Sequence, residues 1–196
     1  MTTYAWKPTP ERIAAANVSR LMRAAGVETA DELRRWSVAD IDAYWDLVVK
    51  DLGLPFDRPY TRIRESSKGI EWTTWFVDGE LNVATACVDR WRNDPDTADR
   101  AAVIYEDEPG AVRTLTYAEL GAEVDRFAAG LRAAGIGKGD AVGSLMPMSP
   151  EAVIAAYAIA KVGALYVPLF SGFAANAIAS RLNDAEAKLV VTTDWS

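Results

Sequence analysis

The sequence contains no histidine and a single cysteine, Cys87. Without histidine, Ser–His and Cys–His activation of a nucleophile and His-based zinc sites are excluded. One cysteine cannot form an internal disulfide, which fits a reducing cytoplasm, and we therefore predict a cytoplasmic protein. We interpret Cys87 itself as a small buried hydrophobe rather than as a nucleophile.

A surplus of cations and a long unbroken apolar run are also missing. The sequence has 21 Lys and Arg against 28 Asp and Glu, a net charge of −7, whereas nucleic-acid binding needs clustered cations. Residues 1–6 lack the cationic region followed by an apolar run with which a signal peptide begins. The most apolar stretch, residues 152–170, is interrupted by Lys161 and Gly163, and a membrane helix needs about 20 nearly unbroken apolar residues. We expect neither a nucleic acid nor a membrane as partner.

The first part of the chain has helical spacing. Apolar residues recur at this spacing from Thr9, a predicted N-cap, to Gly26, where the helix is predicted to end. Ser37 and Asp40 predict a capping box for a second helix, which has one apolar face and closes at Gly53.

An irregular segment follows and suggests a domain boundary. Residues 54–69 carry Pro55, Pro59 and several charges, which is typical of a boundary or a surface loop. Six of the seven tryptophans lie in the first half of the sequence, and Trp rings commonly dock on a neighbouring domain. We therefore predict a helical, aromatic-rich cap over residues 1–60, followed by an α/β region over 61–196.

The second part alternates strands and helices. Residues 101–105 and 111–115 are predicted strands joined by an acidic turn, and Thr116 with Glu119 predicts the capping box of the next helix. Such alternation predicts an α/β fold with a mainly parallel sheet and right-handed crossovers. The other predicted elements are a helix that ends at Gly135, a strand at 141–146, a helix that opens at Ser149, a strand at 164–168, a helix at 174–183 and a strand at 188–192.

Two glycine-containing segments are candidates for ligand binding. Residues 135–140 read Gly-Ile-Gly-Lys-Gly-Asp, but they follow a predicted helix and lack the Ser or Thr that a nucleotide-phosphate loop needs, so a helix cap and turn is favoured. Residues 170–173, Phe-Ser-Gly-Phe, follow a predicted strand, where open α/β sheets bind ligands. Gly172 would let a ligand approach the backbone, and the next helix N-terminus favours an anion. An ordinary strand-to-helix loop is the alternative.

Five stretches in sequence order resemble one enzyme family. These are Trp75–Val83 with its Trp-Phe and Leu-Asn pairs, Cys87–Trp91, Thr116–Leu120, Gly137–Ala152 with Met-Pro and Pro-Glu, and Pro168–Phe173 followed by Arg181, Asp184 and Ala185. They resemble the acetyl-CoA synthetase branch of the AMP-forming acyl-CoA ligases. Three positions depart from the family pattern: Asp78 stands where the first Gly of a pair is usual, Ala86 where Asn is frequent, and Ser171 where the Phe-Gly-Gly-Phe loop has its first Gly.

The resemblance implies a fold, a reaction and a ligand site. It implies that the chain forms the first, mainly parallel sheet layer of a large adenylation domain, with 61–196 as an incomplete N-terminal part. It implies a ligase that converts a small carboxylic acid, ATP and coenzyme A to acyl-CoA, AMP and pyrophosphate through an acyl-adenylate, with Mg²⁺. In the family the Phe-Gly-Gly-Phe loop borders the coenzyme A nucleotide. The resemblance therefore implies that Phe170, Ser171 and Gly172 contact coenzyme A.

The segments that perform the family's chemistry do not occur in these 196 residues. The ATP loop that ends in Pro-Lys, the Tyr-Gly-x-Thr-Glu segment and the catalytic Lys of the mobile C-terminal domain are absent. We therefore assign no catalytic residue and no metal ligand, and expect an N-terminal portion that is inert alone and binds no cofactor tightly. An incomplete sheet exposes an unpaired edge, so self-association is expected. A non-catalytic coenzyme A or nucleotide-binding module and a Trp-rich structural or interaction domain remain as alternatives.

Overall fold

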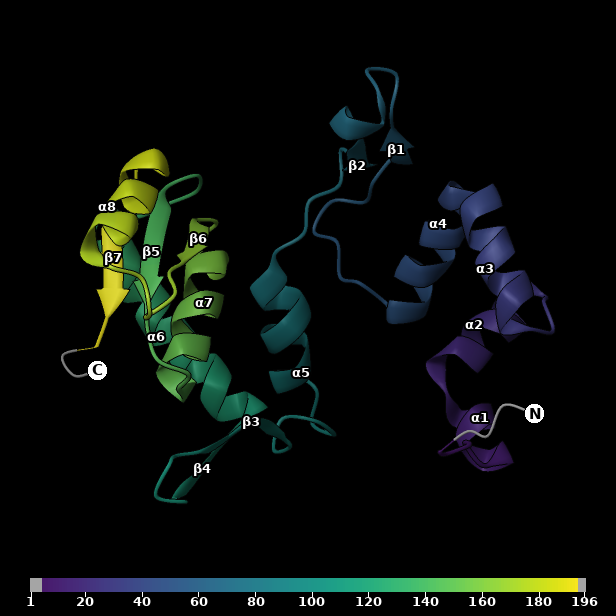
Figure 1. Ribbon diagram of the computed structural model, residues 1–196, viewed down its shortest axis with the longest axis horizontal. Helices are drawn as coiled ribbons and strands as arrows, with labels where there is room; N and C mark the ends of the chain where they lie inside the picture. Colours follow the sequence, from purple (N-terminus) through teal and green to yellow (C-terminus); the bar gives the residue numbers. More distant parts are fainter. Residues whose placement is uncertain (1–4, 194–196) are drawn as a thin grey trace. The chain divides into compact units, whose positions relative to one another are not determined.

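The computed structural model describes residues 5–193 and divides the chain into two compact units, Met1–Glu80 and Leu81–Ser196. Each unit has its own elements and its own buried residues (Figure 1). The domain boundary expected at residue 60 stays a prediction. No helix among residues 5–193 is long and apolar enough to cross a membrane.

The first unit begins with four helices. Thr9 caps the first helix as predicted, because its side chain accepts from the Arg12 backbone N–H, and Gly26 ends the second in the left-handed region at φ 70°. The single helix predicted between them is wrong, since Ala16 is extended (φ −68°, ψ 142°) and separates two helices. The four helices are α1 (Pro10–Ala15), α2 (Asn17–Ala25), α3 (Ala30–Ala39) and α4 (Ile41–Leu52).

The capping box predicted at Ser37 and Asp40 is also wrong. Thr29 and Glu32 form the box instead and start α3 two turns earlier. Ser37 therefore lies inside α3, where its hydroxyl donates to the Arg34 carbonyl. Asp40 caps α4 by accepting from the Ala43 N–H, and α4 ends at Gly53 (φ 56°) as expected.

An antiparallel hairpin lies where an irregular segment was expected. β1 (Arg62–Glu65) pairs with β2 (Thr74–Val77), and the short 3-10 helix η1 (Ile70–Trp72) lies between them. Trp75 of β2 lies 6.0 Å, ring centre to ring centre, from Trp45 of α4. Edge-to-face contacts of this kind continue to Tyr44 and Trp36, so aromatic rings join the helices to the hairpin.

The second unit begins with a helical segment and a hairpin. A π-helical turn, η2 (Thr85–Asp89), runs into α5 (Arg90–Arg92). Its buried side is formed by Ala84 and Val88, which are fully buried, while Cys87 is exposed. The expected burial of Cys87 is therefore wrong, because its neighbours take the inner face. Two strands, β3 (Ala101–Glu106) and β4 (Val112–Thr116), then pair antiparallel within a residue of the predicted bounds.

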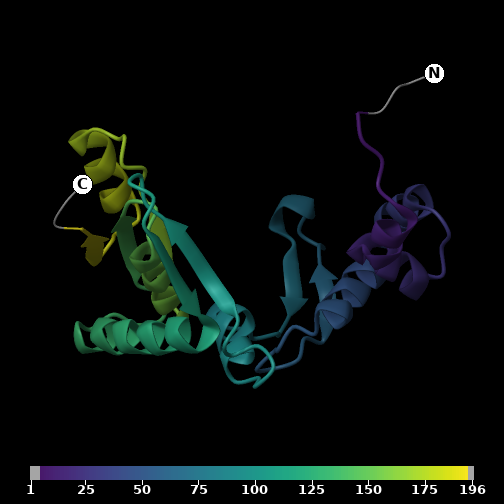
Figure 2. The same cartoon turned by 90° about the horizontal axis from the view of Figure 1, so that it is seen from below.

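A three-stranded parallel sheet forms the rest of this unit and confirms the predicted α/β fold (Figures 1 and 2). The strand order is β6–β5–β7, with both neighbours parallel to the central strand. Helix α6 begins at the predicted Thr116–Glu119 capping box and α7 at the predicted N-cap Ser149. The elements are α6 (Tyr117–Ala133), β5 (Ala141–Leu145), α7 (Pro150–Lys161), β6 (Leu165–Pro168), α8 (Ala175–Asp184) and β7 (Leu189–Thr192).

The two faces of the sheet carry different helices. Val142 of β5 belongs to the core that α6 and α7 form with Val88, Val124 and Ile159. The next residue, Gly143, faces the opposite way, where a Cβ atom would lie only 2.5 Å from Leu182 of α8. Because successive strand residues point to opposite faces, α6 and α7 cover one face and α8 the other.

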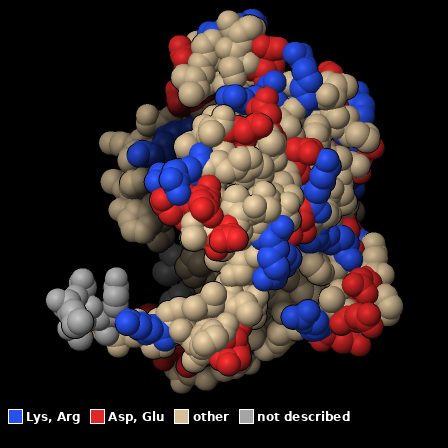
Figure 3. All heavy atoms as spheres, turned by 90° about the vertical axis from the view of Figure 1, so that its right-hand side faces the viewer, with Lys and Arg blue, Asp and Glu red and all other residues tan. Residues whose placement is uncertain are grey.

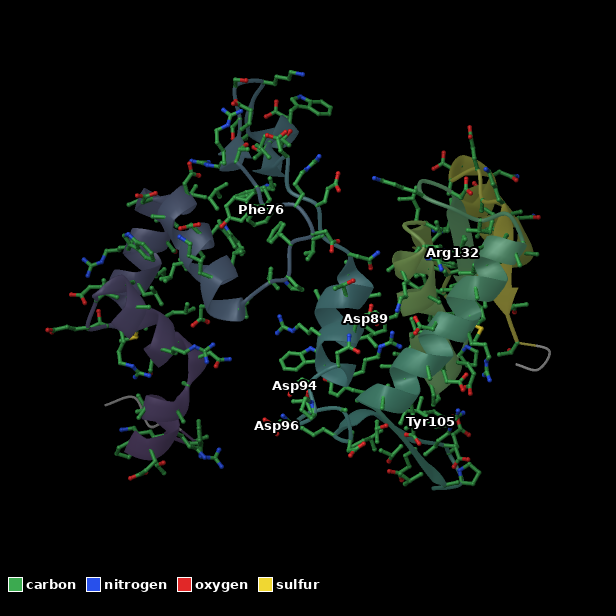
Figure 4. The ribbon with its side chains drawn as sticks, turned by 180° about the vertical axis from the view of Figure 1, so that it is seen from behind. Phe76, Asp89, Asp94, Asp96, Tyr105 and Arg132 are labelled. Carbon is green, nitrogen blue, oxygen red and sulfur yellow. The ribbon has the colours of Figure 1, made fainter. Side chains whose placement is uncertain are left out.

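A network of four charges fastens the helical segment to α6 and α7. Lys161 Nζ lies 2.9 Å from Asp89 Oδ1 and also pairs with Asp125, and Arg92 contacts both carboxylates at 3.1 and 2.5 Å. Asp89, labelled in Figure 4, lies where the segment meets these helices. Burial acts to raise the pKa of Asp125, but hydrogen bonds from Lys161 and Arg92 outweigh it and leave the pKa lowered. Elsewhere, on the face shown in Figure 3, basic and acidic side chains are interspersed.

Candidate functional site

The carboxyl ends of the three parallel strands lie at one edge of the sheet. β5 ends at Leu145 and continues to α7 on one face, whereas β6 ends at Pro168 and continues to α8 on the other face. Neighbouring strands whose connections leave toward opposite faces create a crevice, and ligands of open α/β sheets bind there. The carboxyl ends of β5 and β6 are therefore the candidate site, and the loop predicted from the sequence directly follows β6.

The loop between β6 and α8 is held at its base and open at its tip. The Leu169 N–H donates to the Ser144 carbonyl of β5 at 2.9 Å, and the Leu169 side chain is buried. The Phe173 N–H donates to the Phe170 carbonyl at 3.0 Å and closes a tight turn. Phe170, Ser171 and Gly172 are all exposed in this turn. The structure thus brings together the three residues predicted to contact coenzyme A, and that contact itself stays a prediction.

Gly172 lies directly against the ring of Phe170. A Cβ atom at position 172 would lie 2.5 Å from Phe170 Cε1, which is closer than any real side chain tolerates. The Phe170 ring, 66% exposed, therefore lies against the backbone that a ligand was expected to approach. A group that approaches the Gly172 backbone has to displace this ring or bind against its outer face.

Two further residues, both named in the family resemblance but not as site residues, support the turn. The Phe173 ring lies edge-on to Phe170, with ring centres 5.5 Å apart and an interplanar angle of 84°. The Arg181 guanidinium carbon lies 4.1 Å from the centre of the Phe173 ring, and Nη1 donates to the Ala177 carbonyl at 2.9 Å. Both residues belong to the fifth stretch of the resemblance, but nothing in their eight-residue separation indicates that the two side chains are in contact.

A buried hydroxyl lies at the end of the central strand. Ser144 is 3% exposed, and its Oγ has no hydrogen-bond partner among the described residues. The only signal in the sequence is one serine within an otherwise apolar strand. An unpaired buried hydroxyl is costly, but Ser144 faces the α6 and α7 side rather than the loop.

The second glycine segment, residues 135–140, has the structure expected of a helix end and turn. Gly135 (φ 82°) follows α6, and Gly139 (φ 87°) precedes β5. The Gly137 N–H donates to the Asp140 carboxylate at 2.9 Å. Hydrogen bonds from the Lys188 ammonium and then from this N–H lower the pKa of Asp140. A backbone donor that a phosphate would need is thus already used by Asp140.

Acidic residues do not gather into a metal site. Among residues 5–193, no group of three or more His, Cys, Asp or Glu side chains is arranged to hold a metal ion. Asp107 instead accepts from the Ala111 N–H and stabilises the β3–β4 turn.

Comparisons with known proteins identify relatives along almost the whole chain. Residues 91–196 match the family described as AMP-binding enzyme, and residues 30–87 match the acetyl-coenzyme A synthetase N-terminus. The chain is 40% identical over 194 residues to an acetyl-coenzyme A synthetase of Thiobacillus denitrificans, covering 99% of this chain and 28% of that protein. It is 42% identical over 191 residues to the acetyl-coenzyme A synthetase of Pasteurella multocida, covering 96% and 27%.

A solved structure shares the same fold. The acetoacetyl-CoA synthetase from Streptomyces lividans superposes with a TM-score of 0.89 and 32% sequence identity, covering 96% of this chain and 30% of that chain. Our chain therefore spans less than a third of the length of these relatives.

Proposed function

Since this chain belongs to the AMP-binding enzyme family and is acetyl-CoA-synthetase-like throughout, we propose that the whole protein is an AMP-forming acyl-CoA synthetase. It converts a small carboxylic acid, ATP and coenzyme A to acyl-CoA, AMP and pyrophosphate through an acyl-adenylate. The observation that carries the proposal is the 40% identity over 99% of the chain. The family implies use of ATP and coenzyme A, and we propose Mg²⁺ as the cation that accompanies ATP.

Within this enzyme, residues 5–193 supply scaffold and one wall of the coenzyme A site. Phe170, Ser171 and Gly172 contact the coenzyme A nucleotide. Their exposure at the carboxyl ends of two strands whose connections leave toward opposite faces supports the contact. Ser171 stands where the family has glycine, and its side chain narrows the space through which coenzyme A approaches the backbone. Its backbone N–H can still donate a hydrogen bond to the ligand.

The activity is tested on the whole protein in two half-reactions. Acid-dependent exchange of pyrophosphate into ATP reports adenylation alone, and thioester formation adds coenzyme A. With acetate, propionate and acetoacetate as trial acids, we expect exchange with at least one and thioester formation only with coenzyme A present. Absence of exchange with every short carboxylic acid overturns the proposed activity.

The coenzyme A contact is tested by Gly172→Ala. The added methyl displaces the Phe170 ring, so the KM for coenzyme A is expected to rise about ten-fold, equal to 1.4 kcal/mol, with exchange unchanged. Gly137→Ala is the matched control, because a Cβ there meets nothing within 4 Å and its φ is not left-handed. Equal KM values for coenzyme A in both variants would remove residues 170–172 from the site.

The 196-residue chain on its own is expected to be inert and to bind no cofactor tightly. Calorimetry with coenzyme A tests this, and micromolar affinity would favour the alternative of a non-catalytic binding module. The Trp-rich interaction alternative is favoured by Ile70 and Trp72, which are 80% and 69% exposed on the β1–β2 connection. A shift in tryptophan fluorescence that Trp72→Ser removes, on mixing with the rest of the enzyme, would support it.

Self-association of the chain is a further proposal. Among the strands of residues 5–193, β7 pairs with β5 alone, and Val190 within it is 43% exposed, a combination that favours edge-to-edge pairing. Sedimentation velocity between about 5 and 200 μM, a roughly 40-fold concentration range, should show a sedimentation coefficient that grows with concentration, and less so in Val190→Lys. A monomer throughout, with a sharp melting transition, would contradict it.

A further inference from the structure

We propose that Arg181 is a positioning residue for the coenzyme A loop, acting through the ring of Phe173 rather than by touching the ligand. The proposal rests on the proposed function and extends it to two residues outside the predicted contact. Its role is to hold Phe170, and with it the turn Phe170–Gly172, in one arrangement before coenzyme A arrives. Fixing a loop beforehand improves affinity because less freedom is lost on binding.

A continuous set of contacts leads from Arg181 to Gly172. The guanidinium carbon lies 4.1 Å from the centre of the Phe173 ring. The Phe173 ring in turn lies edge-on to Phe170 at 5.5 Å. The Phe170 ring lies against Gly172, where an added methyl group would push the ring aside. Arg181 thus positions the Phe173 ring, and the Phe173 ring positions the Phe170 ring against Gly172.

The position of the guanidinium is not explained by an ion pair. Among the described residues, no carboxylate lies within ion-pair distance of Arg181 in the structure. Its Nη1 instead donates to the Ala177 carbonyl, toward the N-terminal half of α8. Arg181 belongs to the last turn of α8, where the helix dipole favours a cation, but its side chain folds back along the helix to this carbonyl. The stacking on Phe173 holds the guanidinium over the ring.

The side-chain chemistry separates arginine from lysine at this position. A planar guanidinium stacks flat on a ring, whereas a lysine ammonium is a compact, strongly hydrated charge. We therefore expect Arg181→Lys to restore only part of what Arg181→Ala loses. Phe173→Leu should have the same effect as Arg181→Ala, because both remove the same contact.

The test measures the two half-reactions of the whole protein in four variants: Arg181→Ala, Arg181→Lys, Phe173→Leu and the double variant Arg181→Ala with Phe173→Leu. Arg181→Ala is expected to raise the KM for coenzyme A about three- to five-fold, the size of an exposed cation–π contact, with pyrophosphate exchange unchanged. The double variant should be no worse than either single one. Arg132→Ala, an exposed arginine of α6 labelled in Figure 4, is the control and should change neither half-reaction.

A second ligand distinguishes positioning from direct contact. With 3′-dephospho-coenzyme A, a positioning role predicts the same fold loss in Arg181→Ala, because no phosphate contact is involved. If the loss disappears with this ligand, Arg181 pairs with the 3′-phosphate and the proposal is wrong. Additive losses in the double variant would also overturn it.

A structural readout keeps the inference separate from the proposed activity. In the 196-residue chain, hydrogen exchange of the Phe173 amide, which bonds the Phe170 carbonyl at 3.0 Å, should be faster in Arg181→Ala than in Arg132→Ala. If the hydrogen exchange of the Phe173 amide is the same in both variants, the positioning role is wrong, whatever the enzyme activity of Arg181→Ala. If the wild-type protein forms no thioester but hydrogen exchange at the Phe173 amide is faster in Arg181→Ala, the proposed function is wrong and the contact between Arg181 and the loop is supported.

Discussion

Asp78 holds a backbone conformation that side chains rarely adopt. Its φ is 63°, in the left-handed region, and its carboxylate accepts from the Thr61 hydroxyl at 2.7 Å. The next residue, Gly79, is needed for space, because a Cβ there would lie 2.8 Å from the Phe76 carbonyl oxygen. The family's usual glycine at position 78 is therefore explained by φ, and the glycine at 79 by packing.

We expect Asp78→Ala and Asp78→Gly to separate the cost of the left-handed φ from the contribution of the hydrogen bond to Thr61. Alanine keeps the unfavourable φ and loses the hydrogen bond, so the free energy of unfolding should fall by about 1–2 kcal/mol. Glycine loses the same bond but relieves the backbone, so the change should stay within about 0.5 kcal/mol. Urea denaturation followed by tryptophan fluorescence measures both. Equal losses would show that φ contributes nothing.

Ser144 offers the opposite case, a native residue that costs stability. Its hydroxyl is buried and unpaired among the described residues. Ser144→Ala removes the polar atom with little change in volume, and should raise the free energy of unfolding by about 1 kcal/mol. Ser180→Ala on the exposed side of α8 is the control, with an expected gain below about 0.5 kcal/mol from helix propensity. A loss of stability in Ser144→Ala would mean that the hydroxyl has a partner in solution.

The site could be predicted to the level of its loop, but not of its side-chain contacts. The Phe170–Gly172 turn was identified because a strand followed by Ser-Gly at a sheet edge is a local signal. The contact between Phe173 and Arg181 depends on the rotamers of two side chains eight residues apart. Sequence spacing says nothing about such rotamers, so the contact between these two side chains appears only in the structure.

At the scale of elements, prediction succeeded where the determining signals are local and unopposed. The start of α6 follows from Thr116 and Glu119, and the start of α7 from Ser149 before a proline. It failed where two signals competed, as between Thr29–Glu32 and Ser37–Asp40 for the cap of α3. It also failed for β1, whose residues Arg62–Glu65 are three-quarters charged and are held in a strand by pairing with β2.

The α6 capping box gives a pH dependence with a defined sign. Hydrogen bonds from the Thr116 backbone N–H and then from its hydroxyl lower the pKa of Glu119 below its ordinary 4.5. A carboxylate with a lowered folded-state pKa stabilises fully above its unfolded value, and this stabilisation is lost as pH falls through the folded value. Acidification below 4.5 should therefore remove the contribution of Glu119.

Glu119→Gln tests this dependence, because glutamine can still accept a hydrogen bond but does not ionise. The stability gap between wild type and Glu119→Gln should be widest at pH 7 and narrow as the pH falls below 4.5. Urea midpoints at several pH values measure the gap. Glu108→Gln, in the exposed β3–β4 turn, is the control. A gap that stays constant with pH would show that the carboxylate charge of Glu119 is not involved.

At the scale of the molecule, the boundary between family matches and the boundary between compact units differ. The AMP-binding match begins at residue 91, whereas the second unit begins at Leu81. Residues 81–90 contribute fully buried Ala84 and Val88 to the second unit. Asn82 also donates to the Ala160 and Lys161 carbonyls at the end of α7, at 3.3 and 3.2 Å.

The same segment supplies a charge that the second unit needs. Asp89 is the partner of both Lys161 and Arg92, and these side chains are only 15–22% exposed. Without Asp89, two cations would share the single carboxylate of Asp125 in a partly buried site. Removing one partner of a buried ion pair destabilises by about 3–5 kcal/mol, and somewhat less where water reaches the pair.

We therefore expect residues 81–196 to fold alone and residues 91–196 not to. The longer piece keeps Val88 in the core and Asp89 in the charge network, so it should unfold in one cooperative transition with near-ultraviolet circular dichroism. The shorter piece leaves a cavity at Val88 and an unbalanced pair of cations, which together exceed the stability of a small domain. Asp89→Asn in the longer piece separates the charge from the packing: it should weaken folding without abolishing it. Cooperative unfolding of residues 91–196 would show that the unit begins where the family match begins.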